Sequence, residues 1–355
     1  MTALNTTNWI SHACPQRQPD FKATAIERQS QLTKPAGSLG QLETIAIRLA
    51  DLQQNEQPNV NNIAITLFAG DHGVAEEGVS AFPQEVTAQM VMNFIQGGAA
   101  ISVLAKQLGA QLEVVDTGIA TPLPEQQNLI SQRAGNGTKN SVKQAAMTLQ
   151  QLEIALQAGY DSIERANKNS ATIFIGGEMG IANTTAASVL YCALLGLSPE
   201  QATGARTGLD DAGITHKTNI VTRILEKHQT ECADNALAWL RCAGGFEIVA
   251  LTGAYIRAAQ TGLPILVDGF ISSVAALCAV HINPSVNDYL FFSHISAEHG
   301  HRSVLSHLKQ TALLDLDMRL GEGSGAAVAV SLLQAACTTH NNMATFAEAM
   351  VATQS

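Results

Sequence analysis

The chain has 355 residues, of which 46% are apolar and only 14% are charged. Such a composition can bury a large core, and it argues against disorder over most of the chain. The formal net charge of −10 argues against a nucleic-acid-binding surface, which needs clustered Lys and Arg. A small-molecule enzyme or a subunit of an oligomer fits better, and the length allows about two domains.

The cysteine pattern and the N-terminus indicate the compartment. Six cysteines are scattered without a C-x-x-C pair, so the sequence indicates neither a zinc site nor a redox motif. They are typical of reduced packing residues in a cytosolic protein. The N-terminal segment lacks an apolar signal core, and no uninterrupted apolar run reaches membrane-spanning length. We therefore expect a soluble, cytoplasmic protein without a membrane contact.

The first 59 residues have partly helical spacing, interrupted by the turn-forming segment TKPAGSLGQLE. Ser38 is predicted to cap a helix that begins near Leu39. Lys34, beside this turn, could reach an anion or simply be solvated.

A buried parallel strand is predicted within residues 61–74, because an apolar, β-branched run there ends in Gly-Asp-His-Gly. Ligands bind at such carboxyl edges of sheets. Asp71 and His72 are neighbours in extended chain and point to opposite sides, so they are not expected to form a catalytic pair.

A helix is predicted after Pro83. The mixed apolar and polar set Ser80, Phe82, Gln89 and Met90 suits a flat aromatic ring. An ordinary amphipathic helix explains the same residues equally well.

A second strand is predicted from Gln111 to Ile119, followed by a polar, irregular loop from Thr121 to Ser141 and a helix from Val142 to Ala158. A third strand then ends in a glycine-rich turn that contains Glu178 and Gly180. Such a turn, leading into a helix, presents backbone N–H groups to an anion such as phosphate. The pattern is neither G-x-G-x-x-G nor a Walker loop, so it does not support a dinucleotide or triphosphate site.

The segment that begins near Gly204 places Arg206 and Lys217 near glycines, which suits a phosphate, although a solvated turn is also credible. A helix from Phe246 to Ala259 and a strand ending at Asp268 are predicted next. A later loop holds several His and Glu residues, but their spacing does not match a metal-binding motif.

The most informative segment is residues 315–337, where extended chain, a tight turn and a buried helix are predicted in succession. Glu322 lies between Gly321 and Gly323, with no neighbouring side chain to shield it, so a ligand could approach its carboxylate and the backbone. The alternative is an acidic residue that only favours a helix N-terminus. Strands and helices alternate throughout, which predicts an α/β protein with a mostly parallel sheet covered on both faces.

Several blocks together resemble one enzyme family. They occur between Thr33 and Ala336 in the order TKPAGSLGQLE, DHGV, GVSAFPQEVTAQM, GGEMGIANTTAA, GGFEIVALTGA, LPILVDGF, SHISAEHGH and MRLGEGSGAA. The chain resembles the nicotinate-nucleotide:dimethylbenzimidazole phosphoribosyltransferases. The resemblance implies a homodimer with a large Rossmann-like domain (residues 61–305), whose parallel sheet is flanked by helices. It also implies a smaller, mainly helical domain that is formed from both chain ends (residues 1–60 and 306–355).

The resemblance also implies a reaction. Phosphoribose would move from nicotinate mononucleotide to 5,6-dimethylbenzimidazole, giving α-ribazole 5′-phosphate and nicotinate for the lower ligand of cobalamin. Glu322 would be the general base that accepts the azole proton, since a carboxylate in an apolar pocket has a raised pKa. Glu178 would be a second carboxylate near the ribose. No metal or other cofactor is implied.

The resemblance further implies a set of substrate-binding residues, of which residues 80–90 would hold the benzimidazole, while Gly180 and Lys217 would hold the phosphate. The full set is Ser80, Phe82, Gln89, Met90, Gly177, Gly180, Gly204, Lys217, Leu320, Gly321 and Gly323. The chain departs from the family pattern at Arg206 and Ala182, where glycines are usual.

Two other functions fit parts of the sequence. A nucleotide-binding module without chemistry would keep the glycine turns but would not need Glu322. A nucleoside hydrolase-like enzyme would use water in place of the azole. Nicotinate release from nicotinate mononucleotide, measured with and without a benzimidazole, distinguishes these functions.

Overall fold

The computed structural model describes residues 8–203, 211–298 and 300–352. In these residues seven strands form one sheet in which all neighbours are parallel, in the order β3-β2-β1-β4-β5-β6-β7. The strands are β1 (Ile63–Gly70), β2 (Gln111–Gly118), β3 (Leu129–Ser131), β4 (Ile173–Met179), β5 (Ile265–Val267), β6 (Leu290–His294) and β7 (Ala312–Leu314). This arrangement confirms the predicted α/β class.

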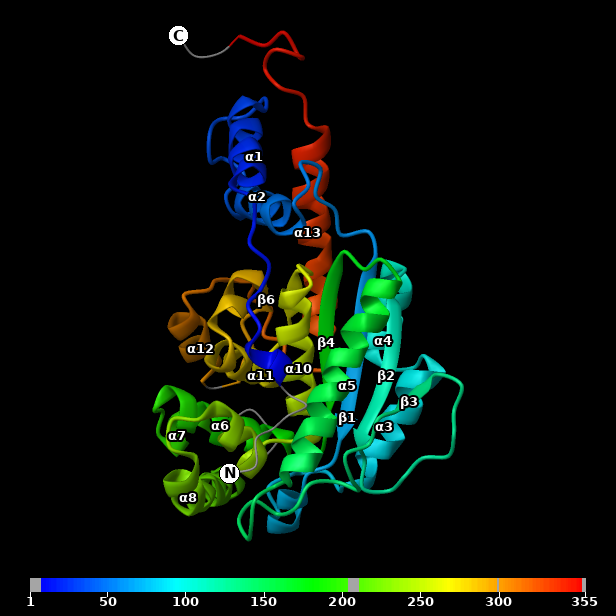
Figure 1. Cartoon of the computed structure of the whole chain (residues 1–355), viewed down its shortest axis with the longest axis vertical. Helices are drawn as coiled ribbons and strands as arrows, with labels where there is room; N and C mark the ends of the chain where they lie inside the picture. Colours follow the sequence, from blue (N-terminus) through cyan, green and yellow to red (C-terminus); the bar gives the residue numbers. More distant parts are fainter. Residues whose placement is uncertain (1–7, 204–210, 299, 353–355) are drawn as a thin grey trace.

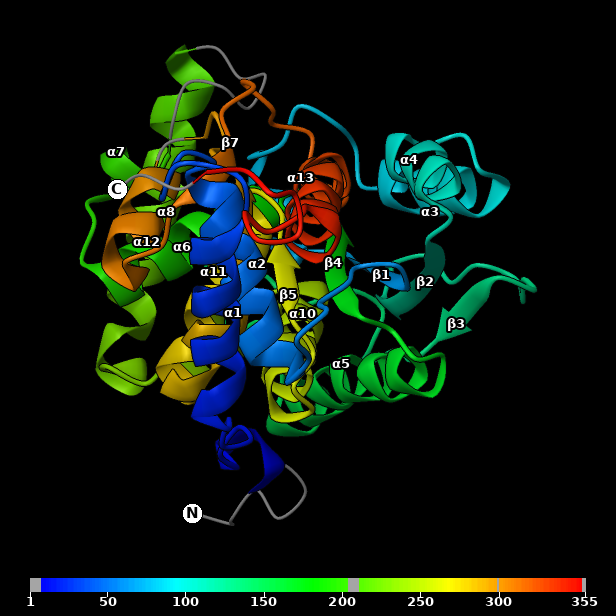
Figure 2. The same ribbon diagram turned by 90° about the horizontal axis from the view of Figure 1, so that it is seen from above.

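Helices cover both faces of the sheet, with α5, α10 and α11 on one face and α3, α4 and α13 on the other (Figure 2). The helices are α1 (Pro19–Gln31), α2 (Gln41–Gln53), α3 (Glu85–Gln96), α4 (Ala100–Leu108), α5 (Leu149–Lys168), α6 (Asn183–Leu195), α7 (Pro199–Ala202), α8 (Asp211–Cys232), α9 (Ala236–Ala243), α10 (Phe246–Gln260), α11 (Phe270–Ile282), α12 (His301–Leu308) and α13 (Ser324–Asn342).

The strand order reverses direction at β1, because the chain passes from β1 outward to β2 and then returns across β1 to β4. At such a switch point the connections leave on opposite faces of the sheet and open a crevice at the carboxyl ends of the strands. The fold therefore predicts a ligand site beyond the ends of β1 and β4.

The centre of the sheet is apolar on both faces. Every residue of β1 is buried, as expected for a β-branched, apolar strand between two helical layers. Helix α10 is buried along nearly its whole length and packs against α5. The two helices approach closely at Gly159, where an added methyl group would lie 2.0 Å from the carbonyl oxygen of Ala250.

Helices α1 and α2 lie beside the C-terminal half of α13 at one end of the molecule, whereas the first described residues, Asn8–Ser11, lie against α10 (Figure 1). Arg28 joins α1 to α13 by donating hydrogen bonds to the carbonyl oxygens of His340 and Asn341, at 2.7 and 2.9 Å. These carbonyls belong to the last turn of α13 and lack helical partners of their own. The side chain of Arg28 thus caps the C-terminal end of α13.

Several predicted elements differ from the structure. Ser38 does not cap α2, because Gly40 occupies the N-cap position. The helix predicted from Val142 begins only at Leu149, after a cap at Thr148. The loop predicted from Thr121 to Ser141 contains the edge strand β3, and the extended run predicted after Asp315 is irregular. The strands β1, β2 and β4 and the helix α10 are confirmed.

Residues 85–108 are together long and apolar enough to cross a membrane, by length and composition alone. They form two helices, because Gly97 adopts a left-handed conformation with φ of 84° that ends α3. The two helices have 12 and 9 residues, whereas a membrane span needs about 20.

We expect Gly159→Ala to lower the free energy of unfolding by roughly 1–3 kcal/mol, because the added methyl group must push α5 away from α10. Equilibrium unfolding in urea measures this change. Gln157→Ala, on the exposed face of the same helix, is the control and should stay within about 0.5 kcal/mol of wild type. Equal stability of Gly159→Ala and wild type would show that the helices can separate without cost.

Candidate active site

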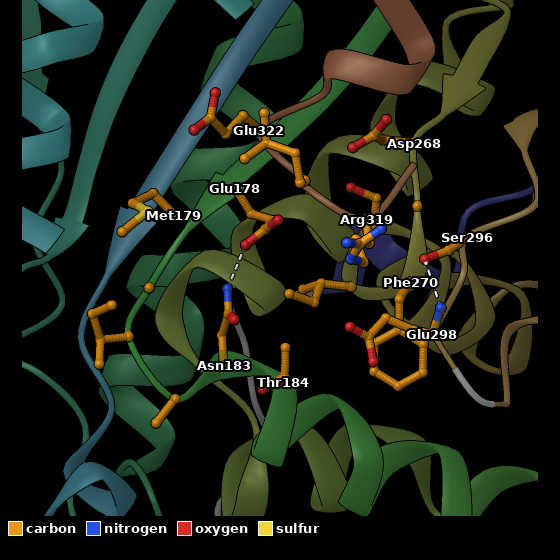
Figure 3. A pocket seen from close by; sticks show the side chains of 18 of the residues that line it. Glu178, Met179, Asn183, Thr184, Asp268, Phe270, Ser296, Glu298, Arg319 and Glu322 are labelled. Atoms are coloured by element: carbon orange, nitrogen blue, oxygen red, sulfur yellow. Dashed lines mark hydrogen bonds between the residues drawn. The ribbon is translucent and has the colours of Figure 1, made fainter. Parts of the chain in front are cut away.

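A cavity of about 550 Å³ lies at the carboxyl edge of the sheet, within the size range of small-molecule sites. Its walls come from the ends of β4, β5 and β6, the start of α3 and the loop before α13 (Figure 3). Several strand ends thus contribute to one site, as the switch point predicts.

The structure brings most of the predicted site residues together here. The cavity is lined by Ser80, Phe82, Met90, Glu178, Gly180, Leu320, Gly321 and Glu322. Gln89 instead lies exposed on α3 and does not line the cavity. Gly204 lies outside the described residues, and so does Arg206.

The loop that carries Glu322 has an unusual backbone. Gly321, Glu322 and Gly323 have φ angles of 86°, 64° and 84°, so three successive residues are left-handed. This conformation costs little for glycine but is strained for a glutamate. Gly177 of β4 lies directly beneath, where a Cβ atom would stand 2.3 Å from the carbonyl oxygen of Glu322. Glycines at 177, 321 and 323 therefore give the loop its shape and its close approach to β4.

Asp268, directly after β5, holds this loop in place. Its Oδ2 accepts a hydrogen bond from the backbone N–H of Gly323 at 3.1 Å, and its Oδ1 accepts one from Ala326 at 2.9 Å. These donors belong to the start of α13, where N–H groups lack helical partners. His294 at the end of β6 lies 3.8 Å from Asp268 Oδ1. Asp268 thus fixes the strand-edge position of Glu322.

Glu322 is only 6% exposed, although its two neighbours in the chain are glycines. Burial raises the pKa of Glu322 to about 7, and the charge of Asp268 adds to this shift, while a hydrogen bond from the backbone of Ile101 opposes it. Its Oε2 is buried and has no hydrogen-bond partner in the structure. The raised pKa means that the carboxyl group can gain or lose a proton near neutral pH.

Glu178 lies at the end of β4, and its Oε2 accepts a short hydrogen bond from Asn183 (Figure 3). Burial raises the pKa of Glu178 to about 8, and the carboxylates of Glu247 and Asp268 contribute to this shift. At neutral pH this carboxyl group is mostly protonated and can donate a hydrogen bond to a ligand oxygen.

The N-terminus of α6 forms the side of the cavity that suits an anion. Ala182 precedes the helix in a left-handed conformation with φ of 73°, which explains why a glycine is usual there. Lys217 of α8 donates a 2.8 Å hydrogen bond to Thr184 Oγ1, and Thr184 lines the cavity. Burial lowers the pKa of Lys217 to about 8. The N-terminus of α6 and one buried amine thus lie at the same wall of the cavity.

A buried hydrogen-bonded pair, His72 and Glu247, lies next to Gly180 of this wall. His72 Nε2 and Glu247 Oε1 are 2.6 Å apart, and both side chains are almost completely buried. Asp71 instead accepts a hydrogen bond from the backbone of Ala120. Asp71 and His72 therefore have separate hydrogen-bond partners.

Sequence reasoning did not assign a site role to several lining residues. They are Asn183, Thr184, Asp268, His294, Ser296 and Arg319. Asp268 and His294 lie at the ends of buried strands, and this position in the sequence could have indicated that they belong to the site. His301 does not line the cavity; its Nε2 is hydrogen-bonded to the hydroxyl of Ser273, and its Nδ1 accepts a hydrogen bond from the backbone N–H of Ser296, which does line it.

Known proteins resemble this chain along nearly its whole length. Residues 14–351 match a family model described as phosphoribosyltransferase. A nicotinate-nucleotide–dimethylbenzimidazole phosphoribosyltransferase of Pseudomonas putida (strain W619) is 55% identical over 344 residues, which cover 97% of this chain and 98% of the relative. The protein of the same name from Pseudomonas fluorescens (strain SBW25) is 55% identical over 347 residues, covering 98% of this chain and 99% of the relative.

A solved structure is similar over almost the whole chain. The crystal structure of the phosphoribosyltransferase of this name from Thermus thermophilus superposes with a TM-score of 0.90 at 42% sequence identity. The match covers 95% of this chain and 100% of that one. The family model spans most of the chain, and the relatives match it nearly end to end. This chain therefore belongs to the phosphoribosyltransferase family.

Proposed function

We propose that this protein transfers phosphoribose from nicotinate mononucleotide to 5,6-dimethylbenzimidazole, giving α-ribazole 5′-phosphate and nicotinate for the lower ligand of cobalamin. The relatives that carry this activity in their names support the substrate pair. The observation that carries the mechanism is Glu322, a buried carboxyl group whose pKa is raised to about 7 within a cavity large enough for both rings.

In the proposed reaction, a ring nitrogen of the azole attacks the anomeric carbon of the ribose with its lone pair. The bond from that carbon to the pyridinium nitrogen breaks, and its electron pair leaves with nicotinate, whose ring becomes neutral without protonation. The proton on the other azole nitrogen passes to Glu322. Its raised pKa brings it closer to that of the azole, so the transfer costs little free energy.

The two sides of the cavity suit the two ends of the reaction. Phe82, Val86 and Met90 supply an apolar wall for the flat azole. The start of α6, with Lys217 behind Thr184, supplies N–H groups and positive charge for the phosphate. Protonated Glu178 can donate a hydrogen bond to the ribose between them.

We also propose a cytoplasmic homodimer with two domains in each chain. The large domain comprises residues 61–305 together with β7, which extends the same sheet, and the chain ends (residues 1–60 and the remainder of 306–355) form the smaller one. Exposed apolar side chains near the cavity, Phe82 (64% exposed) and Leu320 (59%), support a covering subunit. All six cysteines lack a disulfide, which fits a reducing compartment.

Glu322→Gln tests the mechanism. We expect it to bind nicotinate mononucleotide as wild type does but to lower kcat roughly 10²- to 10⁴-fold, because the amide cannot accept the azole proton. Nicotinate release is followed with and without dimethylbenzimidazole, and nucleotide binding is measured by calorimetry.

Wild type should release nicotinate only when the azole is present. Equal release without the azole would support hydrolysis, and no release in either case would support a binding module. Glu226→Gln, an exposed position on α8, is the matched control and should keep the wild-type rate. A wild-type rate for Glu322→Gln would refute its role as the base.

The pKa of Glu322 also predicts a pH profile. Below its pKa the carboxyl group is protonated and cannot accept the azole proton, so kcat/KM should rise with pH and level off above about 7. The residual rate of Glu322→Gln should lack this rise. If the variant and wild type share the same profile, another group controls the pH dependence.

The pKa of Glu178 predicts a cost in stability. Its pKa is about 8 in the folded chain and near 4.5 when solvated, so the folded state holds the extra proton between these values and stability falls as pH rises through them. Glu178→Gln removes this cost and should gain roughly 2–5 kcal/mol relative to wild type between pH 5 and pH 8. Urea unfolding at both pH values measures the gain, which Glu226→Gln should not show.

A further inference from the structure

A cluster of metal-ligating side chains lies where α8 meets α9, outside the cavity. His228, Glu231 and Cys232 are spaced i, i+3 and i+4 on α8, so they share one face of the helix. Cys242 approaches them from α9. None of the four residues lines the cavity.

The ligand atoms of this cluster are close together. One atom each from His228, Glu231 and Cys242 lie within 4.8 Å of one another. The thiol of Cys232 is not among these three atoms, but it is hydrogen-bonded to that of Cys242 and is therefore the candidate for a fourth ligand. Bonds of about 2.0–2.3 Å to a tetrahedral zinc ion place ligand atoms about 3.5 Å apart, so small side-chain rotations would close the site.

The imidazole of His228 is already oriented for metal binding. Its Nε2 lies 2.8 Å from the carbonyl oxygen of Ser141, which can only accept a hydrogen bond. Nε2 therefore carries the hydrogen, and Nδ1 keeps its lone pair. Such a hydrogen bond to a backbone carbonyl is the usual support for a histidine that binds zinc.

The charges around the cluster fit a divalent cation. Two thiolates and one carboxylate together carry a charge of −3. A bound divalent ion brings the net charge to −1, and the guanidinium group of Arg241 brings it to zero. Arg241 contacts Glu231 at Oε1 and Cys242 Sγ at 3.3 Å. Glu231 Oε2 can then bind the ion while Oε1 keeps its contact with the arginine.

We propose that Cys232, Cys242, His228 and Glu231 form a structural zinc site that joins α8 to α9. Three of the four side chains are buried, and the exposed Glu231 gives the ion a path from solvent. Soft thiolate ligands favour zinc over magnesium or calcium. Four protein ligands leave no open position for a substrate, so the ion would stabilise the fold and take no part in the transfer reaction.

Cobalt substitution tests the site. The untagged full-length protein is stripped of metal by a chelator under reducing conditions and then titrated with Co²⁺. We expect one equivalent to give the visible spectrum of tetrahedral cobalt with thiolate charge-transfer absorption, and one equivalent of Zn²⁺ to abolish it. A spectrum of six-coordinate cobalt, or no spectrum, would overturn the proposal.

Variants identify the ligands. Cys242→Ser and Cys232→Ser should each lose thiolate charge transfer and weaken zinc binding at least about tenfold, since loss of a mere supporting group costs about 10–100-fold. Cys14→Ser, a half-buried cysteine outside the cluster, is the control and should bind like wild type. Equal losses in all three variants would refute the assignment. If one of the two cluster variants fails to fold, the wild-type cobalt spectrum and the other variant still test the assignment of the ligands.

Stability and activity separate a structural ion from a catalytic one. Zinc at a hundred times its Kd should raise the Tm of the stripped wild type by about 4 °C, since it binds only the folded state. The kcat for nicotinate release should stay unchanged below the melting range. An unchanged Tm would overturn the proposal. So would a Cys232–Cys242 disulfide in protein that binds no zinc, because the pair would then be redox-active.

Discussion

The active site depends on one buried side chain, that of Asp268, which accepts hydrogen bonds from two backbone N–H groups at the start of α13. These bonds attach α13 to the end of β5 and hold residues 321–323 in three successive left-handed conformations. Without this attachment, a loop that places Glu322 in a strained conformation would relax, since such strain persists only when its surroundings impose it. The position of Glu322, which we propose as the base, therefore follows from the hydrogen bonds of Asp268.

Burial gives the two glutamates different tasks. Glu178 and Glu322 lie in one cavity together with Asp268, and three carboxyl groups in so little water cannot all be ionised. Their pKa values are raised to about 8 and about 7, so near neutral pH Glu178 keeps its proton while Glu322 can gain or lose one. The proposed hydrogen-bond donor for the sugar and the proposed acceptor for the azole proton thus belong to one residue type. The buried carboxyl group of Glu178 also makes the folded chain less stable as the pH rises.

The sequence allowed the strand ends to be predicted, because buried β-branched runs ending in glycine and acidic residues mark β1 and β4 without reference to the rest of the chain. It did not reveal the role of Asp268, whose partners are 55 and 58 residues away. Nor did it show which segments bury Glu322, because the two neighbours of this residue in the chain are glycines. Likewise, Cys232 and Cys242 match no short motif and meet only because α8 and α9 pack together.

Transfer to an azole requires that water be kept from the anomeric carbon, and one chain alone does not achieve this. Phe82 and Leu320 line the cavity while more than half exposed, so its mouth is open in the isolated chain. Filling the apolar wall with the azole removes water from the face that is attacked, which couples departure of nicotinate to the presence of the acceptor. A second subunit over the same exposed side chains would close the remaining opening. The proposed homodimer would therefore serve the chemistry as well as bury apolar surface.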